Sequence, residues 1–163
     1  MSGRLEIRKD FTPYLDIGSP MSGELVSLKQ VPDKVFSSGI MGEGIAILPG
    51  SGSVVAPCDG AVTYNKTFCH MVGITTSDGI EILIHVGLNT PAMEHGMIHC
   101  HVKEKQVVRK GEPLLTVNLD AANSGRNHFL TMVVITNPDC CASVVPEPLG
   151  RKIRAGEKLM TVF

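Results

Sequence analysis

Short apolar runs that alternate with polar residues recur along most of the chain, and glycine and proline separate them. The sequence has 17 Gly and 10 Pro, and the runs are rich in Val and Ile, which suit a pleated, half-buried surface. We therefore expect strands at Gly23–Leu28, Gly44–Leu48, Ser53–Ala56, Gly60–Asn65, Met71–Thr75, Ile80–Val86, Cys100–Val102, Leu114–Asn118, Leu130–Thr136 and Lys158–Val162.

Signals of helix are scarce. A short turn of helix is expected near Pro32–Phe36, and residues 89–99 and 119–125 are weaker candidates. Residues 1–17 are mixed and polar, so we expect an N-terminal arm followed by one domain over residues 18–163. A chain of 163 residues can bury about two-thirds of its unfolded surface, enough for a core.

The chain contains an internal repeat. Residues 20–26 (PMSGELV) resemble residues 57–62 (PCDGAV), and residues 108–117 (VRKGEPLLTV) resemble residues 153–162 (IRAGEKLMTV). Each copy places a turn glycine before an alternating strand. We therefore predict an all-β fold with little helix, an antiparallel β-sandwich or barrel-like pair of sheets built from two copies of one unit.

Composition excludes several function classes. The net charge is −1 and the pI is about 6.6, without a basic run, which argues against nucleic acid as a partner. No apolar stretch approaches the roughly 20 residues of a membrane span, and the N-terminus lacks the apolar region of a signal peptide. The five cysteines include no Cys-x-x-Cys pair, so we expect reduced thiols in the cytoplasm.

Two histidines occupy apolar, strand-like segments. His85 lies in residues 80–87 (IEILIHVG), His70 lies in residues 67–75 (TFCHMVGIT), and only the turn at residues 76–79 separates them. Alternation places Ile84 on one face of its strand and His85 on the other, and antiparallel pairing would bring the two rings together. Two neutral imidazoles in an apolar depression could bind a metal or carry a phosphoryl group.

Six segments in chain order, with both histidines at the family spacing, resemble the glucose-family enzyme IIA of the bacterial phosphoenolpyruvate-dependent sugar phosphotransferase system. The resemblance covers roughly residues 18–163 and implies an antiparallel β-sandwich with a duplicated motif. It also implies that His85 is phosphorylated and that His70 is its partner. The segments are SPMSGE (19–24), VPDKVF (31–36), GEGIAI (42–47), VVAPCDG (54–60), CHMVG (69–73) and EILIHVGLNT (81–90).

The resemblance implies a cytoplasmic phosphotransferase component that accepts phosphate from HPr on His85. It would pass the phosphate to a cysteine of a sugar-specific enzyme IIB, for uptake of a glucose-type sugar. A neutral imidazole suits this task as a nucleophile, and positioning supplies most of the catalysis of phosphoryl transfer. No cofactor is required, although His70 and His85 could also hold zinc.

An apolar rim around the histidines would exclude water and dock partner proteins. By the motif match, its expected members are Val35, Phe36, Ile40, Ile45 and Val86.

Three positions depart from the family pattern. Phe68 replaces a threonine two residues before the first histidine, so another group must orient His70. Asn89 replaces an aspartate after the second histidine, and Lys105 replaces a turn glycine. We expect the first change to affect the rate of transfer and the other two to affect, at most, the choice of partner.

Two other function classes remain open. LytM-type zinc endopeptidases resemble this fold, and His99-Cys-His101, with His95 nearby, has their His-x-His form with both rings on one face. Their His-x-x-x-Asp half-site is not found, however, and no acidic base can be assigned. The chain could also be a regulatory module that binds other proteins, a role compatible with phosphate transfer. Both a free-standing protein and a domain of a larger permease fit the sequence.

Overall fold

The computed structural model describes residues 15–65, 70–88, 97–121 and 129–163, and strands dominate them. The one α-helix in these ranges, α1, spans Lys34–Ser37, and short 3-10 turns lie at Leu28–Gln30 (η1), Leu119–Ala121 (η3) and Pro138–Cys140 (η5). The strands are β1 (Leu15–Gly18), β2 (Gly23–Val26), β3 (Glu43–Pro49), β4 (Ser53–Val55), β5 (Gly60–Asn65), β6 (Met71–Thr75), β7 (Glu81–Val86), β8 (Ile98–Cys100), β9 (Val107–Val108), β10 (Pro113–Val117), β11 (Thr131–Ile135), β12 (Val144–Pro146), β13 (Lys152–Ile153) and β14 (Lys158–Val162).

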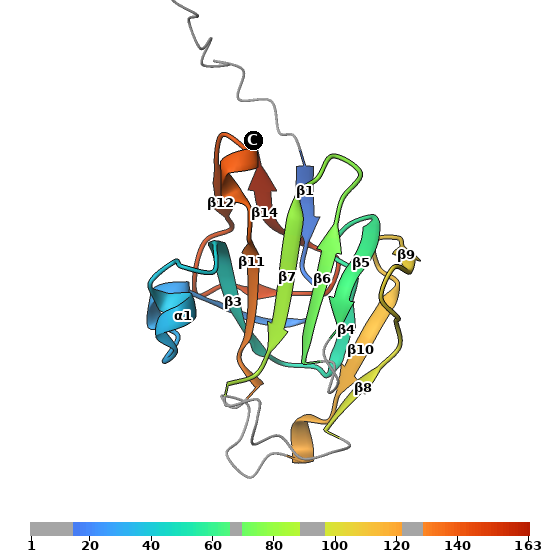
Figure 1. Ribbon diagram of the computed structural model, residues 1–163. Coiled ribbons are helices and arrows are strands. Elements are labelled where there is room, and N and C mark those ends of the chain that lie inside the picture. The colour runs from blue at the N-terminus through green and yellow to red at the C-terminus, as the bar shows by residue number, and fades with distance from the viewer. Residues whose placement is uncertain (1–14, 66–69, 89–96, 122–128) are drawn as a thin grey trace, which may run out of the picture.

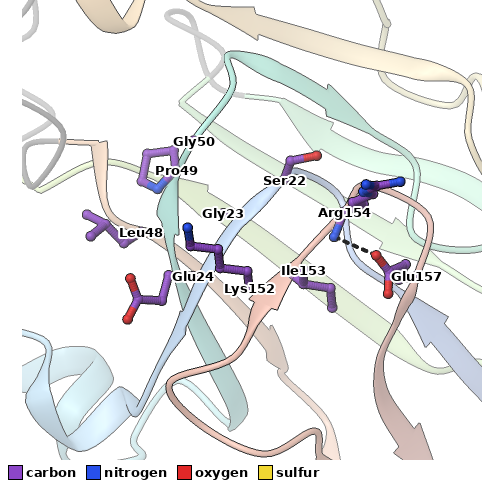
Figure 2. Close-up of a pocket in the computed structure, with 10 residues that line it drawn as sticks. All are labelled: Ser22, Gly23, Glu24, Leu48, Pro49, Gly50, Lys152, Ile153, Arg154 and Glu157. Atoms are coloured by element: carbon purple, nitrogen blue, oxygen red, sulfur yellow. Dashed lines mark hydrogen bonds between the residues drawn. The ribbon is translucent and has the colours of Figure 1, made fainter.

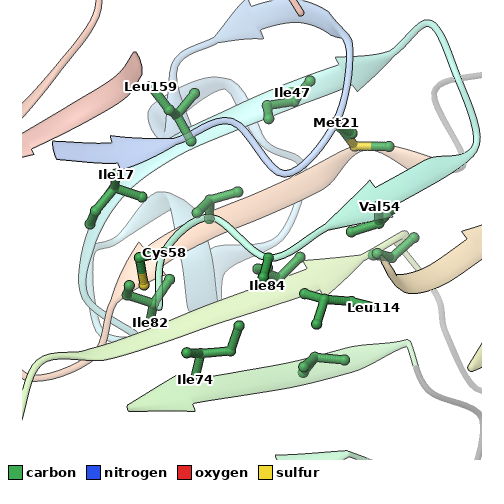
Figure 3. Close-up of a cluster of buried hydrophobic side chains, with 14 of the residues drawn as sticks. Ile17, Met21, Ile47, Val54, Cys58, Ile74, Ile82, Ile84, Leu114 and Leu159 are labelled. Carbon is green, nitrogen blue, oxygen red and sulfur yellow. The ribbon is translucent and has the colours of Figure 1, made fainter. Parts of the chain in front are cut away.

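The strands form three antiparallel sheets. The largest has eight strands in the order β13-β2-β3-β11-β7-β6-β5-β9, and two smaller sheets have the orders β1-β14-β12 and β4-β10-β8 (Figure 1). The main core packs side chains of the large sheet against side chains of both small sheets (Figure 3). The structure therefore confirms the predicted all-β antiparallel sandwich with little helix.

The internal repeat appears as two equivalent halves. Gly23 of β2 faces Ile153 of β13 at one edge of the large sheet, and Gly60 of β5 faces Val108 of β9 at the other edge. In the repeat segments 108–117 and 153–162, the turn glycine has a positive φ, 90° at Gly111 and 89° at Gly156. Glycine adopts this conformation without steric cost. The N–H groups of these two glycines donate to the carbonyl oxygens of Ala56 and Ser19, respectively, which lie at matching positions before β5 and β2.

Alternation along β7 separates two hydrophobic clusters. Ile82, Ile84 and Val86 point into the main core, whereas Leu83 packs on the outer face of the large sheet in a second cluster. Phe36 of α1 belongs to this second cluster, so α1 covers part of the outer face. The period of two predicted from sequence is therefore correct, and it assigns His85 to the face covered by α1.

One predicted boundary was wrong, and one predicted helix is shifted slightly along the chain. Residues 15–17 do not belong to an arm, because Leu15 pairs with Val162 in β14 and Ile17 is fully buried. Residues 1–14 lie outside the described residues. The expected helix near Pro32–Phe36 exists, but it begins at Lys34, because the Asp33 carboxylate caps it by accepting a hydrogen bond from the Val35 N–H.

The weaker helix candidates gave other outcomes. Ile98 and His99, inside the candidate at residues 89–99, belong to β8, and the remainder up to residue 96 lies outside the described residues. The candidate at 119–125 contains only the 3-10 turn η3 among its described residues. The strand expected at Cys100–Val102 is β8 at Ile98–Cys100, since its partner β10 pairs Val117 with Ile98. The predicted set did not include β1, β9, β12 or β13.

Candidate functional site

Antiparallel pairing of β6 with β7 brings the two histidines together. Met71 faces His85 across the pair, and the Val86 N–H donates a hydrogen bond of 2.6 Å to the carbonyl oxygen of His70. The centres of the two imidazole rings lie 5.3 Å apart, with their planes at 76°. The side-by-side arrangement predicted from sequence is therefore present, and one small group can reach both rings.

Apolar side chains enclose the ring of His85. The Phe36 ring packs against it edge to face, with centres 5.0 Å apart, and Phe36 is itself only 3% exposed. Met71 and Met132 are its direct neighbours on the adjacent strands β6 and β11. His85 thus lies at the border of the second cluster, in surroundings that favour a neutral ring.

Burial lowers the pKa of His85 to about 4, from an ordinary value of 6.5. Loss of hydration is the main cause, and repulsion by His70 adds to it, whereas Asp33 and the nearby backbone of Gly87 act in the opposite direction. The Nδ1 atom is buried and has no hydrogen-bond partner of good geometry among the described residues. At neutral pH the ring is therefore uncharged and retains a lone pair for attack.

The five residues predicted for the rim fall into three groups. Val35 in α1 and Ile40 shortly after this helix are exposed, by 46% and 81%. Phe36 contacts His85 but is buried. For Ile45 and Val86 the prediction was wrong. Both side chains lie in the main core. Val86 follows His85 on β7, so its side chain points to the opposite face of the sheet.

His99 and His101 lie together but away from the first pair. Their ring centres are 5.0 Å apart on and just after β8, at the edge of the sheet β4-β10-β8. Among the described residues, no group of three or more His, Cys, Asp or Glu side chains could hold a metal ion. His95 lies outside the described residues, so the hydrolase ligand set has no support in the structure.

The remaining sequence predictions have mixed outcomes. Cys58, Cys140 and Cys141 are free thiols, and burial raises the pKa of Cys58 to about 12. Lys105 has a φ of 71°, which agrees with the family's use of glycine at this turn. Cys69, Phe68 and Asn89 lie outside the described residues.

Sequence reasoning missed one neighbour of the site, Met132. It faces His85 from β11, yet the two residues are far apart in the chain, and only the strand order β11-β7-β6 brings them together. An apolar residue in an apolar run gives no local signal of such a contact.

A cavity of about 460 Å³ lies at the edge formed by β2, β3 and β13 (Figure 2). The Glu157 carboxylate accepts a hydrogen bond from the Arg154 N–H and forms an ion pair with Arg151. No histidine lines this cavity, and both signs of charge do, so we assign it no part in phosphate transfer. Its lining residues are Ser22, Gly23, Glu24, Leu48, Pro49, Gly50, Lys152, Ile153, Arg154 and Glu157.

Comparison with known proteins identifies the family. The sequence model of the phosphoenolpyruvate-dependent sugar phosphotransferase system, EIIA 1, matches residues 15–141. The chain belongs to this family. It is therefore a phosphotransferase component that relays phosphate, as predicted, and the zinc hydrolase alternative is not supported.

Relatives and a solved structure agree with this assignment. The chain is 39% identical over 128 residues to a glucose-specific EIIA component of Bacillus cereus, covering 78% of each. It is 38% identical over 146 residues to a beta-glucoside-specific EIIBCA component of Bacillus subtilis, covering 90% of this chain and 24% of the relative. The glucose permease IIA of Mycoplasma capricolum superimposes with a TM-score of 0.79 at 28% identity, covering 90% of this chain and 94% of that one.

The chain spans only a quarter or less of the fused relatives that combine several components, 24% and 21% of two of them. Among the described residues, no helix is both long and apolar enough to cross a membrane.

Proposed function

We propose that this chain carries a phosphoryl group on His85, accepts it from HPr and passes it to a cysteine of a sugar-specific enzyme IIB. The observation that supports this role is the pair of rings, 5.3 Å apart between centres, in a family that relays phosphate. Names of the relatives include glucose-specific and beta-glucoside-specific components, which favours a glucose-type sugar. With HPr as the donor of phosphate, we expect the reaction to take place in the cytoplasm.

The attacking atom is Nε2 of His85, because Nδ1 is buried. We assign the proton of the neutral ring to the buried Nδ1, which leaves the Nε2 lone pair free for attack. As the new bond from Nε2 to phosphorus forms, the bond between phosphorus and the donor breaks. In the second step a thiolate of enzyme IIB attacks phosphorus, and the bond to Nε2 breaks.

His70 acts without forming a covalent bond. Its ring, directly before β6, adjoins that of His85 on β7, so it can donate a hydrogen bond to an oxygen of the phosphoryl group. The reaction needs no cofactor. Zinc held between the two rings would occupy the nitrogen that accepts phosphate, so bound zinc would inhibit transfer.

Val35 and Ile40 form the exposed part of the docking surface, and Phe36 supports it from below. Apolar contacts there would exclude water while phosphate passes between proteins. The same surface would serve any regulatory protein that binds the unphosphorylated chain, so a regulatory role adds to phosphate transfer and does not replace it.

An assay with phosphoenolpyruvate, enzyme I and HPr tests the proposal through the acid-labile phosphate formed on the chain. His85→Ala should abolish this phosphate, whereas the matched variants His99→Ala and His101→Ala, at exposed positions on and just after β8, should keep it. Full phosphorylation of His85→Ala would disprove the assignment of the acceptor.

A further inference from the structure

His99 and His101 form a second pair of imidazoles outside the phosphate site. Both are exposed and point away from the core, while the intervening Cys100 is partly buried against the core. Their ring centres are 5.0 Å apart, with planes at 65°. Such a separation follows from the strand itself, since residues two apart share one face.

The spacing of these two rings suits one metal ion. Bonds from zinc to imidazole nitrogen are about 2.0–2.1 Å, and a ring nitrogen lies about 1.1 Å from the ring centre, so each centre would lie about 3.2 Å from the ion. Two such rings would have centres about 5.2 Å apart at a tetrahedral angle and about 4.5 Å apart at a right angle. The observed 5.0 Å falls between these values.

Thr116 fixes one of the rings. Its hydroxyl lies 2.8 Å from Nε2 of His101, and Thr116 faces His99 directly across the pair of β10 with β8. This contact engages Nε2 of His101 and leaves Nδ1 as the nitrogen available to a metal. With a metal on Nδ1 the ring proton would be on Nε2, which would then donate to the threonine oxygen. Metal-bound histidines commonly have such a partner on their second nitrogen, which sets the tautomer and orients the ring.

We propose that His99 and His101 bind one divalent transition-metal ion at the surface, with water in the remaining positions. Imidazole is a ligand for Zn²⁺, Ni²⁺ and Cu²⁺, and Cu²⁺ forms the tightest complex of the three at a site of nitrogen and oxygen donors. The site uses neither His70 nor His85, so it can be occupied while phosphate is transferred. With two protein ligands it is an exchangeable binding site and does not by itself provide hydrolysis.

Titration of the whole chain with Cu²⁺, followed by NMR, tests this proposal. The paramagnetic ion should broaden signals of residues in β8 and β10 at the lowest metal concentrations. His99→Asn and His101→Asn should each remove this early broadening, and Thr116→Val should weaken binding about tenfold because the ring loses its orienting partner. All three positions are exposed, so the variants should fold, which the spectra without metal will show directly.

Two results would overturn the proposal. The first is early broadening that centres elsewhere and leaves β8 and β10 unaffected. The second is unchanged broadening of β8 in both asparagine variants. Broadening around β6 and β7 is a separate event at the phosphate site, and the His70→Gln variant identifies it, because this substitution should leave the signals of β8 unchanged in their response to the metal.

Discussion

The Val86 N–H donates a hydrogen bond of 2.6 Å to the carbonyl oxygen of His70. With the pairing of Met71 and His85, this bond sets the register of β6 on β7. A shift of one residue would turn every side chain of one strand to the other face and separate the rings. The geometry of the histidine pair is therefore a property of the backbone.

The first prediction concerns His70, whose ring we propose to orient phosphate without holding it. His70→Gln keeps a hydrogen-bond donor in roughly the same place, so the variant should still accept phosphate from HPr but pass it to enzyme IIB poorly. Rapid-quench measurement of each half-reaction checks this. Loss of the first half-reaction would make His70 essential for attack or folding, and wild-type rates in both would make it a bystander.

A second prediction concerns the titration of His85. NMR detection of its ring protons should give a pKa near 4 in the folded chain. The unfolded chain binds this proton near pH 6.5, so between these two values the unfolded state binds more protons than the folded state. The contribution of His85 to stability is thus greatest above pH 6.5 and falls as the pH decreases towards 4.

Comparison with His85→Gln isolates this effect, because glutamine does not titrate. Between pH 7 and pH 4 the wild type should lose about 2 kcal/mol more free energy of unfolding than the variant, a value reduced from the full shift because the ring is partly open to water. Equal losses in the two proteins, measured by chemical denaturation, would contradict the lowered pKa.

A third prediction tests the cause of that lowered pKa. Loss of hydration is its main source, and Phe36 packs directly on the ring of His85. Phe36→Ala should therefore admit water and raise the pKa of His85 towards 6.5, while Phe36→Leu, which keeps an apolar side chain there, should leave it low. The alanine variant should also lose about 3 kcal/mol of stability, because the side chain is buried. An unchanged pKa in a folded alanine variant would assign the desolvation to other neighbours.

The exposed part of the proposed docking surface gives a fourth prediction. Val35→Ser and Ile40→Ser should each raise the KM for HPr, by about tenfold, because each removes an apolar contact of about 1–1.5 kcal/mol. Their stability should change by less than about 0.5 kcal/mol, since both side chains are exposed. Val107→Ser is the matched control, because Val107 is 75% exposed on the edge strand β9. Equal effects of all three substitutions would disprove a local docking surface.

The alternation of side chains within a strand could be predicted from the sequence, because neighbouring residues determine it. Ile82, Ile84 and Val86 alternate with Leu83 and His85 within one strand, so the faces of β7 follow from six consecutive residues. The strands β9 and β13 have only two residues each and exist because Gly60 and Gly23 of other segments pair with them. No period can be detected over two residues, which is why both strands were missed.

The candidate site shows the same limit. The neighbouring positions of His70 and His85 could be predicted, since one short turn joins their strands. The burial of Ile45 could not be predicted, because a motif match does not show how exposed a side chain is. In the structure Ile45 faces the main core and pairs with Val133 of β11. Ile17 was placed in an arm because its strand is completed by β14, at the far end of the chain.

The last prediction concerns Lys105, the one described residue other than glycine with a positive φ, 71°. Its side chain is exposed, and the Lys105 N–H donates to the Val62 carbonyl oxygen, a bond that glycine would keep. The left-handed conformation costs a residue with a Cβ about 1–2 kcal/mol, and glycine loses about 0.5–1 kcal/mol more than alanine in conformational entropy on folding. Lys105→Gly should therefore stabilise the chain by about 0.5–1 kcal/mol in chemical denaturation, whereas the exposed control Lys103→Gly should destabilise it. A similar loss in both variants would mean that the turn at Lys105 is not strained.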